Sequence, residues 1–196
     1  MQFDQITQKI QELSATKNHI MVAISGYGGS GKTTLTDKLN DHFENDATKL
    51  QLDNFLVNHG EGAGWAGGYD WGRFESVLQD IKDGKDLHYQ WYNWHTDETK
   101  DWVDQPLSKI VIVEGVRLFQ TKLLPYFDLT IWIDCPLETA IERGKARDRA
   151  NKPSDNYDIE AHISKWNEEW TPKEQEFDKL FHPEQIADIS YDSNVA

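Results

Sequence analysis

The sequence is poor in cysteine and in positive charge. Its single cysteine, Cys135, excludes an internal disulfide and is the usage expected in a reducing cytoplasm. Lysine and arginine number 20 against 34 aspartates and glutamates, so the formal net charge is −14. Because contacts with nucleic-acid phosphates need a basic surface, this balance argues against nucleic acid as the main partner. We expect the acidity to serve a soluble, self-repelling surface.

Long hydrophobic runs are also missing. No apolar stretch approaches the ~20 residues that span a bilayer, and residues 1–4 lack the basic and apolar pattern of a signal peptide. The sequence therefore predicts a cytoplasmic protein with no membrane partner. At 196 residues, the chain has room for one well-buried α/β domain but not for two. The oligomeric state stays open, and a homo-oligomer is one alternative.

The most informative segment, residues 26–33, reads GYGGSGKT and matches G-x-x-x-x-G-K-[ST]. An apolar run at 20–24 precedes it, and a helical pattern follows it. This context presents backbone N–H groups to a phosphate chain, and glycine lets the backbone approach closely. Lys32 is expected at the β- and γ-phosphates, with the Thr33 hydroxyl at Mg²⁺. The sequence thus predicts a site for ATP or another nucleoside triphosphate, formed by Gly26, Gly28, Gly29, Ser30, Gly31, Lys32, Thr33 and Thr34.

The sequence also matches, in full or in part, two other nucleotide-binding motifs. Gly26, Gly28 and Gly31 also satisfy the dinucleotide fingerprint G-x-G-x-x-G, with Asp53 near the place of a ribose-binding acid. That fingerprint does not require a lysine and a hydroxyl at the helix start, whereas the phosphate loop does. The guanine-reading pattern N-K-x-D is matched only loosely at 151–155, where the aspartate comes one residue late. We therefore favour a triphosphate-binding loop and interpret the 151–155 match as coincidental.

Apolar periodicity predicts alternating helices and strands. Such alternation with short connections predicts a parallel sheet covered by helices. We expect a single P-loop NTPase-type α/β domain over 1–196, with three layers, a mostly parallel sheet and an aromatic-rich hairpin insertion at about 84–109. The expected helices cover about 3–13, 35–43, 74–81, 136–150 and 158–180, and the expected strands cover 20–24, 49–52, 110–113, 129–133 and 186–189.

Two acids follow predicted strands. Asp53 lies at the carboxyl end of the second strand, where ligands of open α/β sheets bind. A carboxylate there can accept the proton of an attacking hydroxyl or hold Mg²⁺ through water. Glu114 follows the buried run 110–113, which is the Walker B arrangement with Glu in place of Asp. Because an unpaired buried carboxylate is costly, a Mg²⁺ shell nearby would explain it.

Arginines gather in one predicted helix. Arg143 and Arg147 are four residues apart and share a face, and Arg149 follows them. Guanidinium groups neutralise the charge that phosphoryl transfer spreads over oxygens. Charge runs are also common on solvated helix faces. A phosphate-clamping lid and a solvated face therefore both remain open on spacing alone.

Taken in order, these blocks resemble the uridine kinase and phosphoribulokinase group of P-loop kinases. The blocks are the phosphate loop, LDNF at 52–55, IVEGV at 112–116, the arginines at 143–149 and the tail FHPEQIADI at 181–189. The resemblance implies that Asp53 is the catalytic base and that Lys32 binds phosphate. It further implies that Thr33 and Glu114 support the metal and that Arg143 and Arg147 belong to an arginine-rich lid over ATP at about 143–157. By the same resemblance His182 would lie near the adenine.

The acceptor side departs from that family. Where uridine-phosphorylating members carry Phe-Asp-x-Pro, this chain has Gly68-Tyr69-Asp70-Trp71, with no proline. Asp70 corresponds to an acid that grips ribose hydroxyls in those kinases. Their Tyr-Asp-Phe followed by histidine becomes YNWH at 92–95, in which asparagine replaces the acid. The aromatics can stack on a flat substrate or simply pack on the domain. The expected acceptor site comprises Asp53, Tyr69, Asp70, Tyr92, Trp94 and His95.

The sequence thus predicts an ATP- and Mg²⁺-dependent kinase with Asp53, Lys32 and Arg147 as catalytic residues. Its acceptor would be a hydroxyl of a small molecule: a nucleoside, a sugar or a pantothenate-like alcohol. Two other classes stay open, namely a nucleotide-binding regulator with slow hydrolysis and a dinucleotide-dependent oxidoreductase. The presence of both a base and an arginine cluster favours the kinase, because binding alone needs neither.

Overall fold

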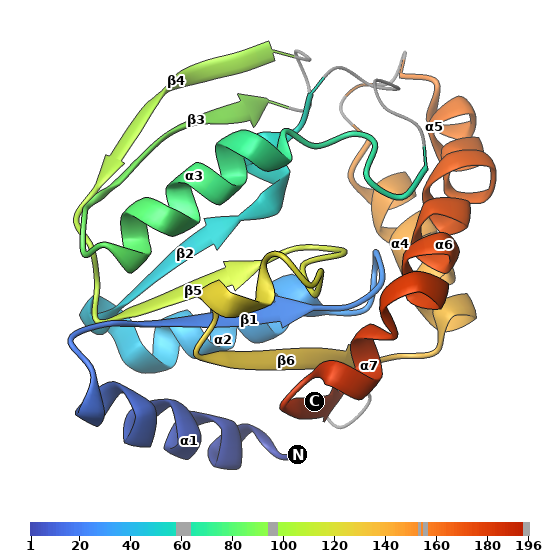
Figure 1. Cartoon of the computed structure of the whole chain (residues 1–196). Helices are drawn as coiled ribbons and strands as arrows, with labels where there is room; N and C mark the ends of the chain where they lie inside the picture. The colour runs from blue at the N-terminus through green and yellow to red at the C-terminus, as the bar shows by residue number, and fades with distance from the viewer. Residues whose placement is uncertain (58–63, 94–97, 153, 155–156, 194–196) are drawn as a thin grey trace.

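A five-stranded parallel sheet forms the centre of the computed structural model, which describes residues 1–57, 64–93, 98–152, 154 and 157–193. Its spatial order is β2-β5-β1-β6-β7, and every neighbouring pair is parallel. The predicted fold class is confirmed (Figure 1). The strands are β1 Ile20–Ser25, β2 Ala47–Gln51, β5 Ile110–Glu114, β6 Leu129–Asp134 and β7 Ile189–Asp192.

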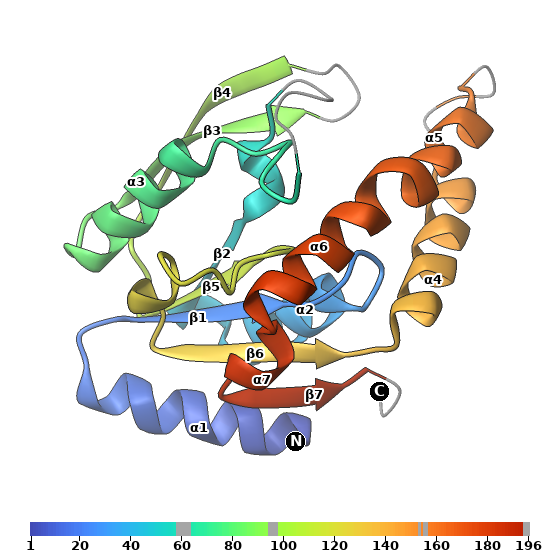
Figure 2. The same cartoon turned by 45° about the vertical axis from the view of Figure 1, so that its right-hand side comes forward.

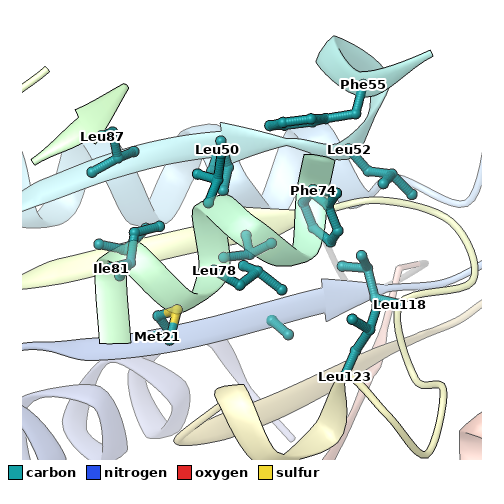
Figure 3. Packing of buried hydrophobic residues seen from close by; sticks show 14 of the residues in the cluster. Met21, Leu50, Leu52, Phe55, Phe74, Leu78, Ile81, Leu87, Leu118 and Leu123 are labelled. Atoms are coloured by element: carbon teal, nitrogen blue, oxygen red, sulfur yellow. The ribbon is translucent and has the colours of Figure 1, made fainter. Parts of the chain in front are cut away.

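Helices cover both faces of the sheet, which explains why its central strands are apolar throughout. On β1, Val22 and Ile24 pack in the cluster that includes residues of α1 (Phe3–Thr16) and α2 (Lys32–Phe43). Met21 and Ala23 point the other way, into the cluster that includes residues of α3 (Trp71–Lys82). Figure 3 shows this second cluster between the sheet and α3. Because side chains alternate along a strand, each central strand contributes residues to two separate hydrophobic cores, one on each face of the sheet.

The aromatic-rich segment forms the predicted hairpin. Strands β3 (Leu87–Asn93) and β4 (Glu98–Gln105) are antiparallel and lie beside α3 (Figure 1). Leu87, Tyr89 and Tyr92 are buried, so this side of β3 packs on the domain. The expected acceptor residues Trp94 and His95 lie outside the described residues.

The carboxy-terminal half departs from the predicted elements in two places. The expected helix at 158–180 is divided into α5 (Ile159–Lys165), a π-helical turn (Trp166–Trp170) and α6 (Thr171–Phe181). The strand predicted at 186–189 is wrong, since Pro183–Ile186 forms the short helix α7 and β7 begins at Ile189. Pro183 at the first helical position favours that turn. Helix α4 (Leu137–Ala150) stands beside α5 and α6 (Figure 2).

Three short 3₁₀ turns complete the described elements: Glu44–Asp46, Leu52–Phe55 and Leu124–Tyr126. None of the helices in the described ranges is both long and apolar enough to cross a membrane. The register of the sheet places Glu114 of β5 between Ile24 of β1 and Gln51 of β2. The residues that follow these three strands therefore meet at one edge of the sheet, where open α/β folds bind ligands.

Candidate functional site

The phosphate loop connects β1 to α2 and has the backbone of an anion-binding turn. Gly31 precedes the helix with φ of 106°, and Gly29 has φ of 81°. A side chain at Gly29 would place its Cβ 2.1 Å from the carbonyl oxygen of Ala140, so only glycine fits against α4. The first N–H groups of α2 have no intrahelical acceptor, as at any helix start. The loop is therefore shaped to receive an anion at the start of α2.

Behind the loop lie Thr33 and Glu114, two of the three residues predicted to form a metal site, in hydrogen-bond contact with each other. Thr33 Oγ1 donates to Glu114 Oε1 at 3.2 Å, and Gln51 Nε2 donates to the same oxygen at 2.6 Å. Glu114 is 5% exposed, and its Oε2 is buried with no hydrogen-bond partner in the described part of the chain. Burial raises the pKa of Glu114, against the opposing effects of Gln51 and Lys32. An orphaned buried carboxylate oxygen beside a threonine hydroxyl fits a hard divalent cation.

Lys32 lies close to three carboxylates. Its Nζ donates to the carbonyl oxygen of Tyr27 at 2.9 Å. Burial lowers the pKa of Lys32, while Glu174, Glu114 and Asp53 act to raise it. A desolvated ammonium held near these acids is a preorganised positive charge at the loop.

Asp53 lies in the 3₁₀ turn after β2, and its partner is Tyr69. The Tyr69 hydroxyl donates to Asp53 Oδ1 at 3.0 Å, and the guanidinium of Arg117 lies 5.1 Å from the centre of the Tyr69 ring. Burial raises the pKa of Tyr69, so this hydroxyl remains a donor at neutral pH. Asp53 and Tyr69, both predicted acceptor residues, are thus brought together.

Among the described residues, two cavities of several hundred Å³ border the phosphate loop. The helix-start cavity, about 350 Å³ in volume, is lined by residues 29–35 with Lys38, Arg143, Arg147, Tyr191 and Ser193. The strand-end cavity, about 390 Å³, lies beyond β2 and β5 and is bounded on its other side by α5, the π turn and α6. Asp53, Tyr69 and Glu114 line the strand-end cavity and do not line the helix-start cavity. The two cavities share Gly29, Lys32, Thr33 and Arg147.

The arginines of α4 differ in their surroundings. Arg143 lines the helix-start cavity, where its Nη1 donates to Ser193 Oγ at 3.2 Å. Arg147 lines both cavities and binds Asp148 through Nε and Nη2 at 2.9 and 2.8 Å. Arg149 instead pairs with Glu160, away from both cavities. Of these three arginines, only Arg143 and Arg147 line a cavity that borders the phosphate loop.

Several predicted site residues lie elsewhere. Asp70 caps α3, its Oδ1 accepting the Arg73 N–H at 2.9 Å, and it does not line either of the two described cavities. Tyr92 is 3% exposed inside the hairpin and His182 ends α6 in a left-handed conformation, both also outside those cavities. The structure thus brings Asp53 and Tyr69, but not Asp70 or Tyr92, to the strand-end cavity.

Other cavity residues were not predicted. Glu174 Oε1 accepts the N–H of Gly28 at 2.8 Å, and the Trp166 ring lies against Gly28 and Gly144. Arg117 follows the Glu114-Gly115 block with φ of 57° and is 8% exposed. The position of Arg117 just after a strand end could have indicated from the sequence that it lines the site. Glu174 offered no such signal, because it is one of several acids in a charged helix.

A glycine loop between β1 and α2, with a threonine and an acid behind it, is the arrangement of a P-loop kinase fold. The chain belongs to the phosphoribulokinase / uridine kinase family, whose model matches residues 66–185. The family-level prediction is therefore confirmed.

Individual relatives are about a quarter identical to this chain over the aligned residues. Uridine-cytidine kinase B of Dictyostelium discoideum is 26% identical over 157 residues, which is 71% of this chain and 62% of that protein. A uridine kinase of Borrelia hermsii is 28% identical over 145 residues, or 67% and 68% of the two chains. A structure described as a possible uridine kinase from Bacillus stearothermophilus has a TM-score of 0.69 at 20% identity. It covers 96% of this chain and 100% of that one, and it shows the fold alone.

Proposed function

We propose that the protein transfers the γ-phosphoryl group of ATP to a hydroxyl of a small molecule. The observation that carries this proposal is the pair of cavities that meet at Gly29, Lys32, Thr33 and Arg147. A kinase needs separate donor and acceptor sites that converge on the transferred group. A regulator that only binds a nucleotide has no need of the second cavity. Family membership favours the phosphate loop over the dinucleotide reading of the same glycines.

In this proposal the nucleotide occupies the helix-start cavity. The loop N–H groups and Lys32 bind its phosphates, with Arg143 and Arg147 reaching them from α4. Thr33 and Glu114 would hold Mg²⁺, with Asp53 at its outer shell through water. A bound Mg²⁺ supplies charge neutralisation on the phosphate oxygens. The unpaired Glu114 Oε2 supports that assignment.

The acceptor occupies the strand-end cavity, where Asp53 is the base. Its carboxylate takes the proton of the acceptor hydroxyl as that oxygen forms its bond to the γ-phosphorus. The bond from phosphorus to the ADP oxygen breaks at the same time. Tyr69 holds Asp53 by its 3.0 Å hydrogen bond, so the base is oriented before the acceptor arrives. Lys32 and Arg147, which border both cavities, stabilise the charge of the moving phosphoryl group.

Sequence relatives named as uridine or uridine-cytidine kinases make a nucleoside the first acceptor to test. Sugars and pantothenate-like alcohols follow, because the family's acceptor motifs at 68–71 and 92–95 are altered here. The test is a screen of nucleosides, sugars and vitamin precursors with Mg²⁺ and ATP, read by mass detection of phosphorylated products. We expect product with at least one small alcohol. Transfer to protein alone, or hydrolysis that no small alcohol stimulates, would contradict the proposal.

Ligand-induced stabilisation separates the nucleotide classes. ATP with Mg²⁺ at a hundred times its Kd should stabilise the native state by about 2.7 kcal/mol, which is roughly 5–11 °C in melting temperature for a chain of this size. NAD should give no comparable shift. A larger shift with NAD than with ATP would contradict the kinase proposal and favour the alternative hypothesis of a dinucleotide-dependent oxidoreductase.

A further inference from the structure

Glu174 is a buried acid to which the proposed reaction has assigned no role. It lies in α6, is 8% exposed and lines the strand-end cavity with Asp53 and Lys32. Its Oε1 accepts the N–H of Gly28 at 2.8 Å. Neither Gly28 nor Glu174 lines the helix-start cavity. Glu174 therefore lies on the acceptor side of the phosphate loop.

Only one oxygen of this carboxylate is engaged. Oε1 accepts the N–H of Gly28, which is the one hydrogen bond that the described residues make to this carboxylate, and Glu174 lines the strand-end cavity. Burial raises the pKa of Glu174, and Lys32, the Gly28 N–H and Arg117 oppose that effect. A buried acid with a fixed oxygen and a free one is suited to accept a hydrogen bond from a ligand hydroxyl.

The π-helical turn at 166–170 helps to place this acid. Trp166 and Glu174 are eight residues apart, which in a regular α-helix leaves them about 80° out of phase. The wider π turn advances the chain by a smaller angle per residue and reduces that offset. Both side chains consequently reach Gly28: a Cβ there would lie 3.0 Å from the Trp166 ring and 3.3 Å from Glu174 Oε1.

Most cations of the strand-end cavity are already engaged. Lys173 pairs with Glu169 at 2.8 Å, and Arg147 pairs with Asp148. Lys32 and Arg147 also border the helix-start cavity, where the phosphates of the nucleotide would occupy them. These cations are therefore committed to partners other than the acceptor.

The side chain of the remaining cation, Arg117, is held by contacts with residues of the domain. Its Nη1 donates to the carbonyl oxygen of Trp65, and its guanidinium covers the ring of Tyr69. Asp53 and Glu174 contribute two carboxylates to the lining of the same cavity. A carboxylate or phosphate on the acceptor would meet these acids beside the phosphates of ATP, and like charges at close range repel one another.

We propose that Glu174 is a specificity-determining residue that binds a hydroxyl of an uncharged polyhydroxy acceptor and disfavours acceptors that carry a carboxylate or a phosphate. The inference rests on the proposed kinase function. It assigns Asp53 to the hydroxyl that is phosphorylated and Glu174 to a second hydroxyl of the same molecule. The acceptor class is thus a neutral sugar, nucleoside or polyol.

Matched acceptor pairs test this proposal. Pantothenol and pantothenate, and glycerol and glycerate, differ mainly in a neutral hydroxymethyl group against a carboxylate. For the neutral members that are phosphorylated, Glu174→Gln should raise the acceptor KM roughly ten- to a hundredfold, the worth of a hydrogen bond to a charged group. The ATP KM should stay within about twofold, because Gln can still accept the Gly28 N–H. The preference for neutral over anionic members should shrink in the variant.

Glu168→Gln is the matched control, since Glu168 is exposed in the same helical region and lines neither described cavity. Unchanged acceptor KM in Glu174→Gln, or a wild-type preference for pantothenate and glycerate, would overturn the inference while leaving the kinase proposal standing. A raised ATP KM with an unchanged acceptor KM would make Glu174 a support of the phosphate loop only. Failure of the wild type to phosphorylate any alcohol, in this set or in the wider screen, would overturn both proposals.

Discussion

The contact between α4 and the π turn should be sensitive to a single methyl group. At Gly144, an added Cβ would lie 2.2 Å from Cη2 and 2.4 Å from Cζ2 of Trp166. Carbon atoms normally approach to about 3.5–4.0 Å, so the Trp166 ring or the helix must move by more than ~1 Å. Alanine gains about 1 kcal/mol over glycine in a helix, and overpacking costs roughly 1–3 kcal/mol. A 2.2 Å approach belongs at the upper end of the overpacking range, about 2–3 kcal/mol, so we expect Gly144→Ala to destabilise the fold by about 1–2 kcal/mol.

Thermal unfolding measures this change, which corresponds to a fall of roughly 2–8 °C in melting temperature. Because Trp166 also contacts Gly28 and donates to Asp148 Oδ2 at 2.8 Å, turnover of ATP should fall as well. Gly72→Ala in α3 is the control, since its nearest neighbour is Asp70 Oδ1 at an ordinary 3.6 Å. That variant should be neutral or slightly more stable.

A double-mutant cycle isolates the clash itself. Trp166→Phe removes part of the ring that faces Gly144. The loss in the free energy of unfolding caused by Gly144→Ala should therefore be smaller in the Trp166→Phe background than in the wild type. The reasoning would be refuted if Gly144→Ala lowered the free energy of unfolding equally with Trp or Phe at position 166. A Gly144→Ala protein as stable as Gly72→Ala would refute it as well.

Three further outcomes follow from the site. Lys32→Ala should nearly abolish transfer while its melting temperature stays close to that of the wild type; normal turnover would refute the phosphate-loop assignment. Asp53→Asn keeps an acceptor for Tyr69 but cannot take a proton, so the rate should fall roughly 10²–10⁴-fold with ATP binding preserved; loss of ATP binding would instead make Asp53 a metal or structural residue. Because burial raises the pKa of Glu114 in the folded state, ionising it removes stability as pH rises. Glu114→Gln should therefore raise the ligand-free melting temperature at pH 7, with a gain that disappears below pH 4.5, and should weaken stabilisation by Mg²⁺ and ATP; a gain that persists in acid would exclude this cause.

Local sequence signals were enough to predict much of the fold and one half of the site. The strands at 20–24, 110–113 and 129–133 are apolar because both faces are buried, and this pattern is readable without a structure. The phosphate loop, Thr33 and Glu114 follow from motif spacing, since the strand order brings β5 beside β1. Asp53 was predicted from its position after the second strand.

The acceptor half was harder because it depends on contacts between distant segments. Glu174 reaches Gly28 across 146 residues, and the π turn that helps to place it has no sequence pattern that we could read. Asp70 was expected to bind the acceptor, yet its carboxylate caps α3, a role that aspartate fills at many helix starts. The strand predicted at 186–189 began three residues early because an apolar residue, Ile186, belongs to a helical turn instead.

The central claim is direct transfer from a nucleotide in the helix-start cavity to an alcohol in the strand-end cavity. The decisive measurement is the ratio of ADP formed to phosphorylated acceptor formed, using the best acceptor of the screen with Mg²⁺ and ATP. We predict one phosphorylated acceptor for each ADP above the acceptor-free background, and loss of both products in Lys32→Ala. ADP release that is unchanged by every alcohol, or that exceeds the phosphorylated product several-fold at saturating acceptor, would contradict the claim.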